Sequence, residues 1–287
     1  MTLREIVDAA RQRLERAGIA GSEAALDAEL LARDVLNWDR SEWIARQHEQ
    51  PPASFEAQFA PLVARRGQRE PIAYIRGRQE FYGREFAVSP AVLIPRPETE
   101  LLIDEARLLL PALGFSRPLM VVDVGTGSGC LIVTLALEYP RARYVATDVS
   151  DEALTIARAN AARHGVANRI EFVLGAYFAG VTAPVNVVVS NPPYVAERDR
   201  GTLPPEVVNH EPSAALFGGD DGLRDVREIV RQAGDLLDDD GSLLMEMGYA
   251  QLDRVAAVVE ETAHLALVRT RADLQGIPRV AVIRRCR

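Results

Sequence analysis

An asparagine, two prolines and a tyrosine follow a run of three valines in the stretch V-V-V-S-N-P-P-Y at residues 187–194. Such a run of β-branched residues is typical of a strand buried on both faces, and successive prolines cannot donate to a β-ladder. The strand is therefore expected to end at Asn191. The side-chain oxygen of Asn191 and the backbone carbonyl of Pro192 are hydrogen-bond acceptors that could together hold the N–H groups of a substrate.

A glycine-rich turn, D-V-G-T-G-S-G at residues 123–129, follows another predicted strand. Glycines let the backbone turn tightly and approach a ligand with no Cβ atom in the way. Asp148 closes the next strand, 21 residues after Gly127, at the spacing where a carboxylate receives the two ribose hydroxyls of an adenosine. A glycine turn alone is common in α/β folds, but together with Asp148 it favours adenosine binding. The residues expected at this site are Asp123, Gly125, Thr126, Gly127, Ser128, Gly129 and Asp148.

The charge of the turn distinguishes between two adenosine compounds. A dinucleotide site requires G-x-G-x-x-G, with a helix N-terminus facing a pyrophosphate. Here the spacing is G-x-G-x-G, and Asp123 places a negative charge beside the loop, which disfavours phosphate. A carboxylate suits the ammonium and sulfonium groups of S-adenosylmethionine. The turn therefore favours this methyl donor over NAD.

Seven apolar stretches alternate with amphipathic helical patterns from about residue 98 onward. Such alternation predicts an α/β fold with a mostly parallel sheet and helices on both faces. No helix separates the last two stretches, so one of these strands is expected to run antiparallel. Ligands of open α/β sheets bind beyond the carboxyl ends of the strands, where both the glycine-rich turn and N-P-P-Y are expected. The predicted strands cover residues 119–125, 144–149, 170–174, 185–190, 242–247, 265–270 and 279–285.

The first 72 residues show only helical periodicity and predict a small all-helical domain. Four helices are expected, of which the second buries Leu26 and the third is capped by Ser41. Short alternating stretches follow, I-A-Y-I-R-G at 72–77 among them, and these predict a β-hairpin connector. The predicted division is 1–72, 73–97 and 98–287.

Bulk composition excludes several classes of protein. The 287 residues carry a net charge of −8, whereas a protein that neutralises a nucleic-acid backbone is usually basic. All 33 Lys and Arg residues are arginine, which removes lysine Schiff-base chemistry. Two cysteines are too few for a disulfide framework, and the four histidines lack the spacing of metal ligands, so no metal is expected. Without an apolar signal peptide or a span of roughly 20 apolar residues, the cytoplasm is the expected location.

Five motifs resemble those of the protein-(glutamine-N5) methyltransferases that modify peptide chain release factors. The glycine-rich turn and N-P-P-Y resemble class I methyltransferases that act on a planar nitrogen. I-P-R-P-E-T-E at 94–100, E-P-S-A-A-L-F-G-G-D-D-G-L at 211–223 and E-M-G at 246–248 narrow the resemblance to this family. It implies a class I methyltransferase fold, S-adenosylmethionine as cofactor, and methylation of the glutamine in the Gly-Gly-Gln loop of a release factor that the N-terminal helical domain helps to hold.

A glutamine amide nitrogen is a poor nucleophile because its lone pair is delocalised into the carbonyl. Two acceptors aimed at its hydrogens, Asn191 Oδ1 and the Pro192 carbonyl, would fix the NH₂ group and leave the nitrogen facing the donor methyl. Pro192 and Pro193 shape this pair before the substrate arrives, and Tyr194 can lie flat on the amide plane. The methylated nitrogen is acidic enough to lose its proton to water or Asn191, so no general base is needed. Asn191 is thus expected to border both cofactor and substrate.

Further residues are expected around these motifs. The resemblance implies that Tyr177 stacks on the adenine ring, beside Ala176, where many relatives carry an aspartate. Charge-assisted hydrogen bonds that brace the loop above the site are expected from Arg96, Glu98 and Glu246. Three aromatic residues of the hairpin are expected either to wall the substrate pocket or to pack in the core: Phe81, Tyr82 and Phe86.

Two alternatives stand beside this hypothesis. The first is an adenine-N6 or other nucleic-acid amine methyltransferase, because adenine carries the same planar NH₂ group. Such an enzyme needs a basic surface that contacts the nucleic acid, or a base-flipping domain. Residues 1–70 carry ten arginines against twelve Asp and Glu residues, which fits a protein partner better. The second is a non-enzymatic binding module that has a methyltransferase fold but has lost its activity. The presence of Asp148 and Asn191 argues against this alternative. We expect a monomer that binds release factors and neither membranes nor nucleic acid directly.

Overall fold

A computed structural model of the chain describes residues 1–114, 118–182 and 184–286. The chain divides into two compact units, Met1–Gly77 with Pro204–His210 and Arg78–Leu203 with Glu211–Arg287. The first unit thus extends past the predicted boundary at residue 72. The first unit also includes Pro204–His210, a segment that was predicted to belong to the α/β domain.

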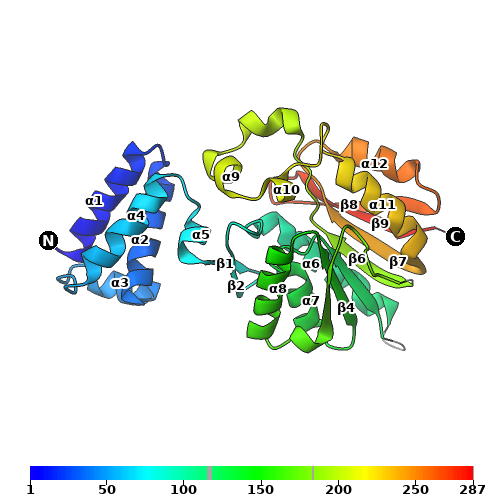
Figure 1. Cartoon of the computed structure of the whole chain (residues 1–287), viewed down its shortest axis with the longest axis horizontal. Coiled ribbons are helices and arrows are strands. Elements are labelled where there is room, and N and C mark those ends of the chain that lie inside the picture. Colours follow the sequence, from blue (N-terminus) through cyan, green and yellow to red (C-terminus); the bar gives the residue numbers. More distant parts are fainter. Residues whose placement is uncertain (115–117, 183, 287) are drawn as a thin grey trace. The chain divides into compact units, whose positions relative to one another are not determined.

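The first unit is a bundle of short helices. They are α1(Leu3–Arg16), α2(Gly21–Leu36), α3(Arg40–Arg46), α4(Phe55–Gly67), α5(Ile72–Arg76) and α9(Pro205–His210). Figure 1 shows α1, α2 and α4 side by side, and their inward faces form a core around Leu14, Leu31 and Phe59. The four helices predicted for the first 72 residues are therefore confirmed as α1 to α4.

The buried face of α2 differs from the predicted one. Leu26 is 56% exposed, because Ala24, Ala28 and Leu31 point inward instead. Asp27 lies on the same buried face. Because this buried residue is acidic, a prediction that is based on apolar residues alone does not identify the buried face of α2.

Two other local expectations are corrected. Asp39 caps α3 in place of Ser41, and its carboxylate accepts the backbone N–H of Glu42 at 2.8 Å. The I-A-Y-I-R-G stretch forms helix α5 rather than a strand. Pro71 stands directly before this helix, and Gly77 ends it with a left-handed φ of 70°, which is a typical helix stop.

A buried ion cluster attaches α9 to the other helices of the first unit. Arg66 in α4 is 1% exposed, and two of its guanidinium nitrogens lie 2.6 Å from carboxylate oxygens of Asp27 and Glu23. Its third nitrogen lies 3.1 Å from Glu206 Oε1. Arg69 Nη2 lies 2.7 Å from the other carboxylate oxygen of Glu206. Because Glu206 belongs to α9, these two arginines hold a segment that follows N-P-P-Y in the chain.

Replacing Arg66 by alanine is expected to lower the free energy of unfolding of this unit by about 3–5 kcal/mol, because it leaves the Asp27 carboxylate buried without its partner. Arg65→Ala, on the same helix, is the matched control. Its ion pair with Glu70 is between side chains that are 44% and 20% exposed, and such a pair contributes about 0–1 kcal/mol. Chemical denaturation followed by circular dichroism measures both changes. Equal losses would contradict the buried cluster.

A seven-stranded sheet forms the centre of the second unit, with strands β3(Met120–Val124), β4(Arg143–Asp148), β5(Ile170–Leu174), β6(Val185–Ser190), β7(Leu237–Glu246), β8(Leu265–Ala272) and β9(Pro278–Arg285). Their order is β5-β4-β3-β6-β7-β9-β8. β9 is antiparallel to β7 and β8, and the other neighbours are parallel. The predicted α/β sheet with one antiparallel strand is therefore confirmed. β1(Arg78–Phe81) and β2(Arg84–Ala87) form the predicted hairpin.

Helices cover both faces of this sheet. They are α6(Glu100–Leu113), α7(Cys130–Glu138) and α8(Asp151–Arg163) on one face, and α11(Arg224–Leu236) and α12(Leu252–Glu260) on the other (Figure 1). The valine run is buried on both faces, as predicted, since Val187 and Val189 belong to one core and Val188 to the other. The connections contain the short turns η1(Pro97–Thr99), η2(Ala167–Arg169), η3(Glu197–Thr202) and α10(Ser213–Leu216). Within the described ranges, none of the helices combines the length and apolar character that a membrane crossing requires.

The chain changes its direction of travel across the sheet at β3. From β3 it passes to β4 and β5 on one side and then returns to β6 on the other. Val124, the last residue of β3, pairs with Ser190, the last residue of β6. The glycine-rich turn and N-P-P-Y therefore leave the sheet from neighbouring strand ends. Ligands of open α/β sheets bind at such a switch point.

Candidate active site

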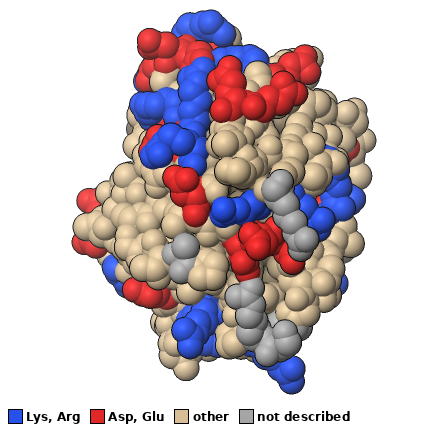
Figure 2. Space-filling view, turned by 90° about the vertical axis from the view of Figure 1, so that its right-hand side faces the viewer, with Lys and Arg blue, Asp and Glu red and all other residues tan. Residues whose placement is uncertain are grey.

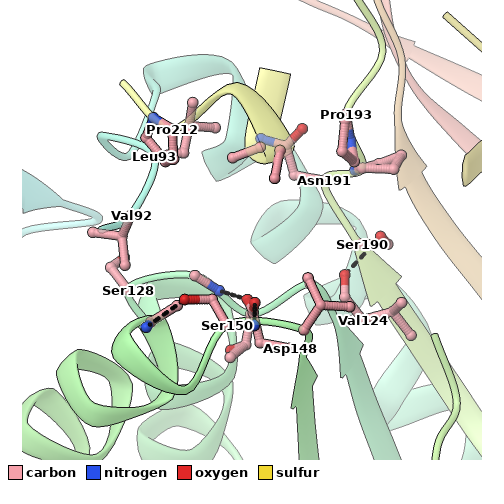
Figure 3. Close-up of a pocket in the computed structure, with 18 of the residues that line it drawn as sticks. Val92, Leu93, Val124, Ser128, Asp148, Ser150, Ser190, Asn191, Pro193 and Pro212 are labelled. Atoms are coloured by element: carbon pink, nitrogen blue, oxygen red, sulfur yellow. Dashed lines mark hydrogen bonds between the residues drawn. The ribbon is translucent and has the colours of Figure 1, made fainter. Parts of the chain in front are cut away.

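A cavity of about 490 Å³ opens at the carboxyl ends of β3, β4 and β6. Small-molecule sites typically measure about 300–1,000 Å³. Figure 3 shows Asp148 on one side of this cavity and Asn191 on the other. Asp123, Gly129 and Tyr194 lie outside its lining. The other residues predicted for the site all line it: Gly125, Thr126, Gly127, Ser128, Asp148, Tyr177, Asn191, Pro192 and Pro193.

Asp148 ties the glycine-rich turn to the end of β4. Its Oδ2 accepts the backbone N–H of Gly127 at 2.9 Å, and its Oδ1 accepts that of Ser150 at 2.9 Å. These bonds fix the carboxylate at the cavity wall (Figure 3). Each carboxylate oxygen can accept a second hydrogen bond. The geometry therefore permits the predicted contact with ribose hydroxyls, which stays a prediction.

Asp123 lies beneath the turn rather than in the cavity wall. It is fully buried, and its Oδ2 accepts the hydroxyl of Thr126 at 2.7 Å. Burial raises the pKa of Asp123 to about 7, so its charge is incomplete at neutral pH. Asp123 thus supports the turn through Thr126. A direct contact between its carboxylate and a cationic ligand stays a prediction.

Tyr177 lines the cavity with an unusual backbone φ of 52°. The hydroxyl of Thr147 donates to the carbonyl of Tyr177 at 2.5 Å, and the Tyr177 hydroxyl donates to Asp225 Oδ1 at 2.9 Å. Asp225 also lines the cavity, so α11 supplies a carboxylate on this side, where position 176 has alanine. The sequence offered little signal for Asp225, because an acidic residue in the first turn of a helix is explained by the helix dipole alone.

Asn191 is joined to residues from two distant parts of the chain. Its Nδ2 donates to Thr99 Oγ1 at 3.1 Å, and the Thr99 hydroxyl donates to Glu246 Oε2 at 2.6 Å. The Tyr194 hydroxyl lies 3.3 Å from Oε1 of the same Glu246. Asn191 Oδ1 is shielded from solvent and has no hydrogen-bond partner among the described residues. The network thus leaves Oδ1 as the unused acceptor of the carboxamide.

Burial also changes the proton affinities in this network. Glu246 is 1% exposed, and burial raises its pKa to about 7 although the hydrogen bonds from Thr99 and Tyr194 oppose the shift. Burial raises the pKa of Tyr194 as well, so its phenol stays protonated at neutral pH. Because Tyr194 binds Glu246 and lies outside the cavity lining, its predicted stacking on a substrate amide stays a prediction.

The 211–223 motif holds the backbone that follows Tyr194. The N–H of Val195 donates to the carbonyl of Leu216 at 2.9 Å. A Cβ atom on Gly222 would lie 2.3 Å from the carbonyl oxygen of Tyr194, and its φ is 76°. Only glycine fits this position. The motif therefore shapes the loop from which Asn191 and Tyr194 project.

Arg96 braces the loop above the site, as predicted. Its guanidinium is hydrogen-bonded to one carboxylate oxygen of Glu211. The other oxygen of Glu211 accepts the backbone N–H of Ile94 at 3.2 Å. The I-P-R-P-E-T-E and 211–223 motifs are thus joined directly. The expected bracing role of Glu246 is confirmed through Thr99, whereas the Glu98 carboxylate forms no hydrogen bond or ion pair within the described part of the chain.

The aromatic residues of the hairpin pack instead of walling the cavity. Phe81 and Phe86 are buried in the core beneath α6 and α7, and the Tyr82 hydroxyl donates to Asp104 at 2.9 Å. Residues 90–93, which follow the hairpin, line the cavity in their place. The sequence offered no signal for them, because a short apolar loop between prolines has no periodicity.

The order of the strands, the glycine-rich turn and the cavity at the switch point define a class I methyltransferase fold. Residues 5–77 match the family model described as PrmC N-terminal domain, and residues 102–214 match the one described as methyltransferase small domain. The fold is shared by the hMettl16 catalytic domain solved with MAT2A 3′UTR hairpin 1, with a TM-score of 0.55 and 17% identity over 78% of this chain and 80% of that chain. A methyltransferase from Pyrococcus furiosus has a TM-score of 0.51 and 19% identity over 79% and 98% of the two chains.

Curated relatives named release factor glutamine methyltransferase align with nearly the whole chain. The identity is 41% with the protein of Koribacter versatilis, over 99% of both chains. It is 42% with that of Cereibacter sphaeroides and 38% with that of Deinococcus radiodurans, again over 99% of each chain. This chain belongs to the release factor glutamine methyltransferase family.

Proposed function

We propose that this protein transfers a methyl group from S-adenosyl-L-methionine to the side-chain amide nitrogen (N5) of the glutamine in the Gly-Gly-Gln loop of peptide chain release factors. The observation that carries the proposal is the position of Asn191 Oδ1. It is a shielded acceptor without a partner among the described residues, in the wall of the cavity that also contains Asp148. Relatives at about 41% identity, named for this activity, support the substrate.

The residues of the cavity fit S-adenosylmethionine. When bound, this compound would supply a methyl group from a positively charged sulfonium sulfur, which keeps the electron pair of the broken S–CH₃ bond and leaves as a neutral thioether. The charged residues that line the cavity are three acids and one base, Asp148, Glu152, Asp225 and Arg224, which suits a cationic ligand. Asp148 would hold the ribose, the ring of Tyr177 would border the adenine, and the backbone at Gly125 and Gly127 would lie along the ligand.

Asn191 and Pro192 would orient the substrate amide. Asn191 Oδ1 and the Pro192 carbonyl accept its two N–H groups, so the nitrogen lone pair faces the donor methyl. Pro192 restricts both its own φ and the conformation of Asn191, so the acceptors are in place before the substrate binds. Positive charge that moves onto the nitrogen is stabilised by these two oxygen dipoles. Water or Asn191 then accepts the proton that the methylated nitrogen loses.

The proposed activity is tested with isotopically labelled donor and purified release factor. Mass spectrometry should locate one methyl group on the glutamine of the Gly-Gly-Gln loop, and a release factor with alanine at that position should remain unlabelled. RNA and DNA incubated in parallel should also remain unlabelled. Label on nucleic acid but not on the release factor would overturn the proposal in favour of an adenine or other base methyltransferase.

The distribution of charge supports a protein substrate. Figure 2 shows a face of the molecule on which arginine and carboxylate side chains are intermixed. On α11 and α12, Arg227 and Arg254 both pair with Asp221, at 2.6 and 3.0 Å. Paired arginines are poorly available to phosphates. We therefore propose that the protein acts on release factors without binding nucleic acid directly. Our proposal also includes a cytoplasmic location and a monomeric state.

The helical unit is the proposed docking site for the release factor. Deleting residues 1–70 is expected to abolish methylation of intact release factor, while affinity for the methyl donor stays the same because every residue of the cavity lies in the other unit. Calorimetry measures donor binding and mass spectrometry measures methylation. A short Gly-Gly-Gln peptide serves as the control substrate, since it needs no docking and should still be methylated slowly. Normal methylation of the intact factor by the truncated protein would refute the docking role.

A further inference from the structure

The hydrogen bonds behind Asn191 have a definite direction. An ionised carboxylate can only accept hydrogen bonds, and a hydroxyl has one proton to donate. Thr99 gives its proton to Glu246 at 2.6 Å, so toward Asn191, at 3.1 Å, it can only accept. The part of the carboxamide that faces Thr99 must therefore be its NH₂ group. Oδ1 is left for the substrate.

The cost of burying Glu246 indicates that its carboxyl group has a use. A buried carboxyl is unfavourable compared with an apolar side chain of similar size. Glu246 is 1% exposed at the end of β7 and lies opposite Val280 of β9, which is fully buried in an apolar core. An apolar residue would satisfy the packing there. The hydrogen bonds of Glu246 to Thr99 and Tyr194 are what an apolar residue would lose.

We propose that Thr99 and Glu246 are positioning residues that hold the Asn191 carboxamide in the one orientation in which Oδ1 accepts from the substrate amide. A flipped carboxamide would point its own N–H donors at the N–H donors of the substrate. The acceptor pair with the Pro192 carbonyl would then be lost. This role rests on the proposed function, because it assumes a planar NH₂ group next to Asn191.

The relay works in either protonation state of Glu246, whose pKa burial raises to about 7. A proton on Oε1 can be donated to the Tyr194 hydroxyl, while Oε2 still accepts from Thr99. The nearby Glu98 raises this pKa further and Arg279 lowers it, so both states are accessible near neutral pH. A glutamine at position 246 copies the protonated state, because its oxygen can accept from Thr99 and its NH₂ group can donate to Tyr194.

Paired substitutions at the two positions test this role. Thr99→Val and Glu246→Met keep the side-chain size but remove the relay, and each is expected to lower kcat about 10- to 100-fold through misorientation of Asn191. Thr99→Ser and Glu246→Gln keep the required acceptor and donor, and they are expected to retain a kcat close to that of the unmodified protein. Affinity for the methyl donor, measured by calorimetry, should be unchanged in all four.

Thr134→Val is the matched control for Thr99→Val. Thr134 is also fully buried, but its hydroxyl has no partner among the described residues and it is outside the cavity lining. It should leave kcat unchanged. Because Thr99 and Glu246 act in series, the double variant Thr99→Val/Glu246→Met should lose no more kcat than the more affected single variant.

Three outcomes would overturn the positioning role: full kcat in Thr99→Val, equal losses in Thr99→Ser and Thr99→Val, or multiplied losses in the double variant. The thermal unfolding midpoint of Glu246→Met shows whether this variant folds. If it does not, the comparison of Thr99→Val with Thr99→Ser is sufficient to test the positioning role. Failure of this role is distinct from failure of the proposed function. In the first case the unmodified protein still methylates the release factor, whereas in the second the unmodified protein leaves it unlabelled.

Discussion

Replacing Asn191 by alanine is expected to lower kcat by about four orders of magnitude, because substrate orientation and electrostatic stabilisation each contribute about a hundredfold or more. The change removes Oδ1, the carboxamide acceptor that has no hydrogen-bond partner within residues 1–114, 118–182 and 184–286. The Pro192 carbonyl remains, so the substrate amide is held at one hydrogen only and can rotate. Affinity for S-adenosylmethionine should stay nearly the same, since the glycine-rich turn and Asp148 are untouched.

Asn186→Ala is the matched control for this experiment. Asn186 lies near the start of β6, the strand that Asn191 directly follows. Its Oδ1 accepts the N–H of Met120 at 2.8 Å and its Nδ2 donates to Asp238 at 3.1 Å. Its loss should lower stability and leave kcat intact. Single-turnover methylation of a release factor measures both variants, with donor binding followed by calorimetry. An Asn191→Ala protein as active as the unmodified one would remove the proposed mechanism.

Replacing Asp148 by alanine is expected to weaken binding of S-adenosylmethionine by at least about a hundredfold, because hydrogen bonds to a charged group contribute about 1.5–3 kcal/mol each. Two effects combine here. The ribose loses its acceptor, and the backbone N–H groups of Gly127 and Ser150 lose the carboxylate that ties the turn to β4. At saturating donor, kcat should fall much less than affinity, because Asp148 does not touch the reacting amide.

Asp151→Ala is a suitable control for Asp148→Ala. It removes an equal charge three residues further along, from a side chain that is 73% exposed. Donor affinity should change little in this variant, so a loss specific to Asp148 cannot be a general effect of charge. Isothermal calorimetry with S-adenosylmethionine provides the comparison. Equal affinities of Asp148→Ala and the unmodified protein would show that the predicted ribose contact is wrong.

The sheet and the edge that carries the cavity could be predicted because their signals are local. The strand at 185–190 is buried at every position, and its apolar run already shows this. In a parallel sheet the carboxyl ends of the strands share one edge, so a glycine turn after one strand and N-P-P-Y after another must lie on the same side. Gly127, Asp148 and Asn191 were found for this reason.

Two of the misses have the opposite cause, since each depends on a partner far away in the chain. Aspartate is a residue type that is usually exposed. The energetic cost of burying Asp27 is offset by its ion pair with Arg66, 39 positions later. Leu26 was placed inward in its stead. In the same way Glu206 joins the helical unit through an arginine 140 positions earlier, which no local pattern indicates.

The amino-acid sequence alone predicted an α/β methyltransferase fold, a sulfonium compound as the methyl donor, and Asn191 as the residue expected to bind the substrate amide. Folding in three dimensions settled how that asparagine is oriented. Thr99 is 92 positions from Asn191 and 147 positions from Glu246, and the three meet only when η1, β6 and β7 are packed together. The direction of a hydrogen bond depends on both partners, so no residue considered by itself could reveal which end of the carboxamide faces the cavity.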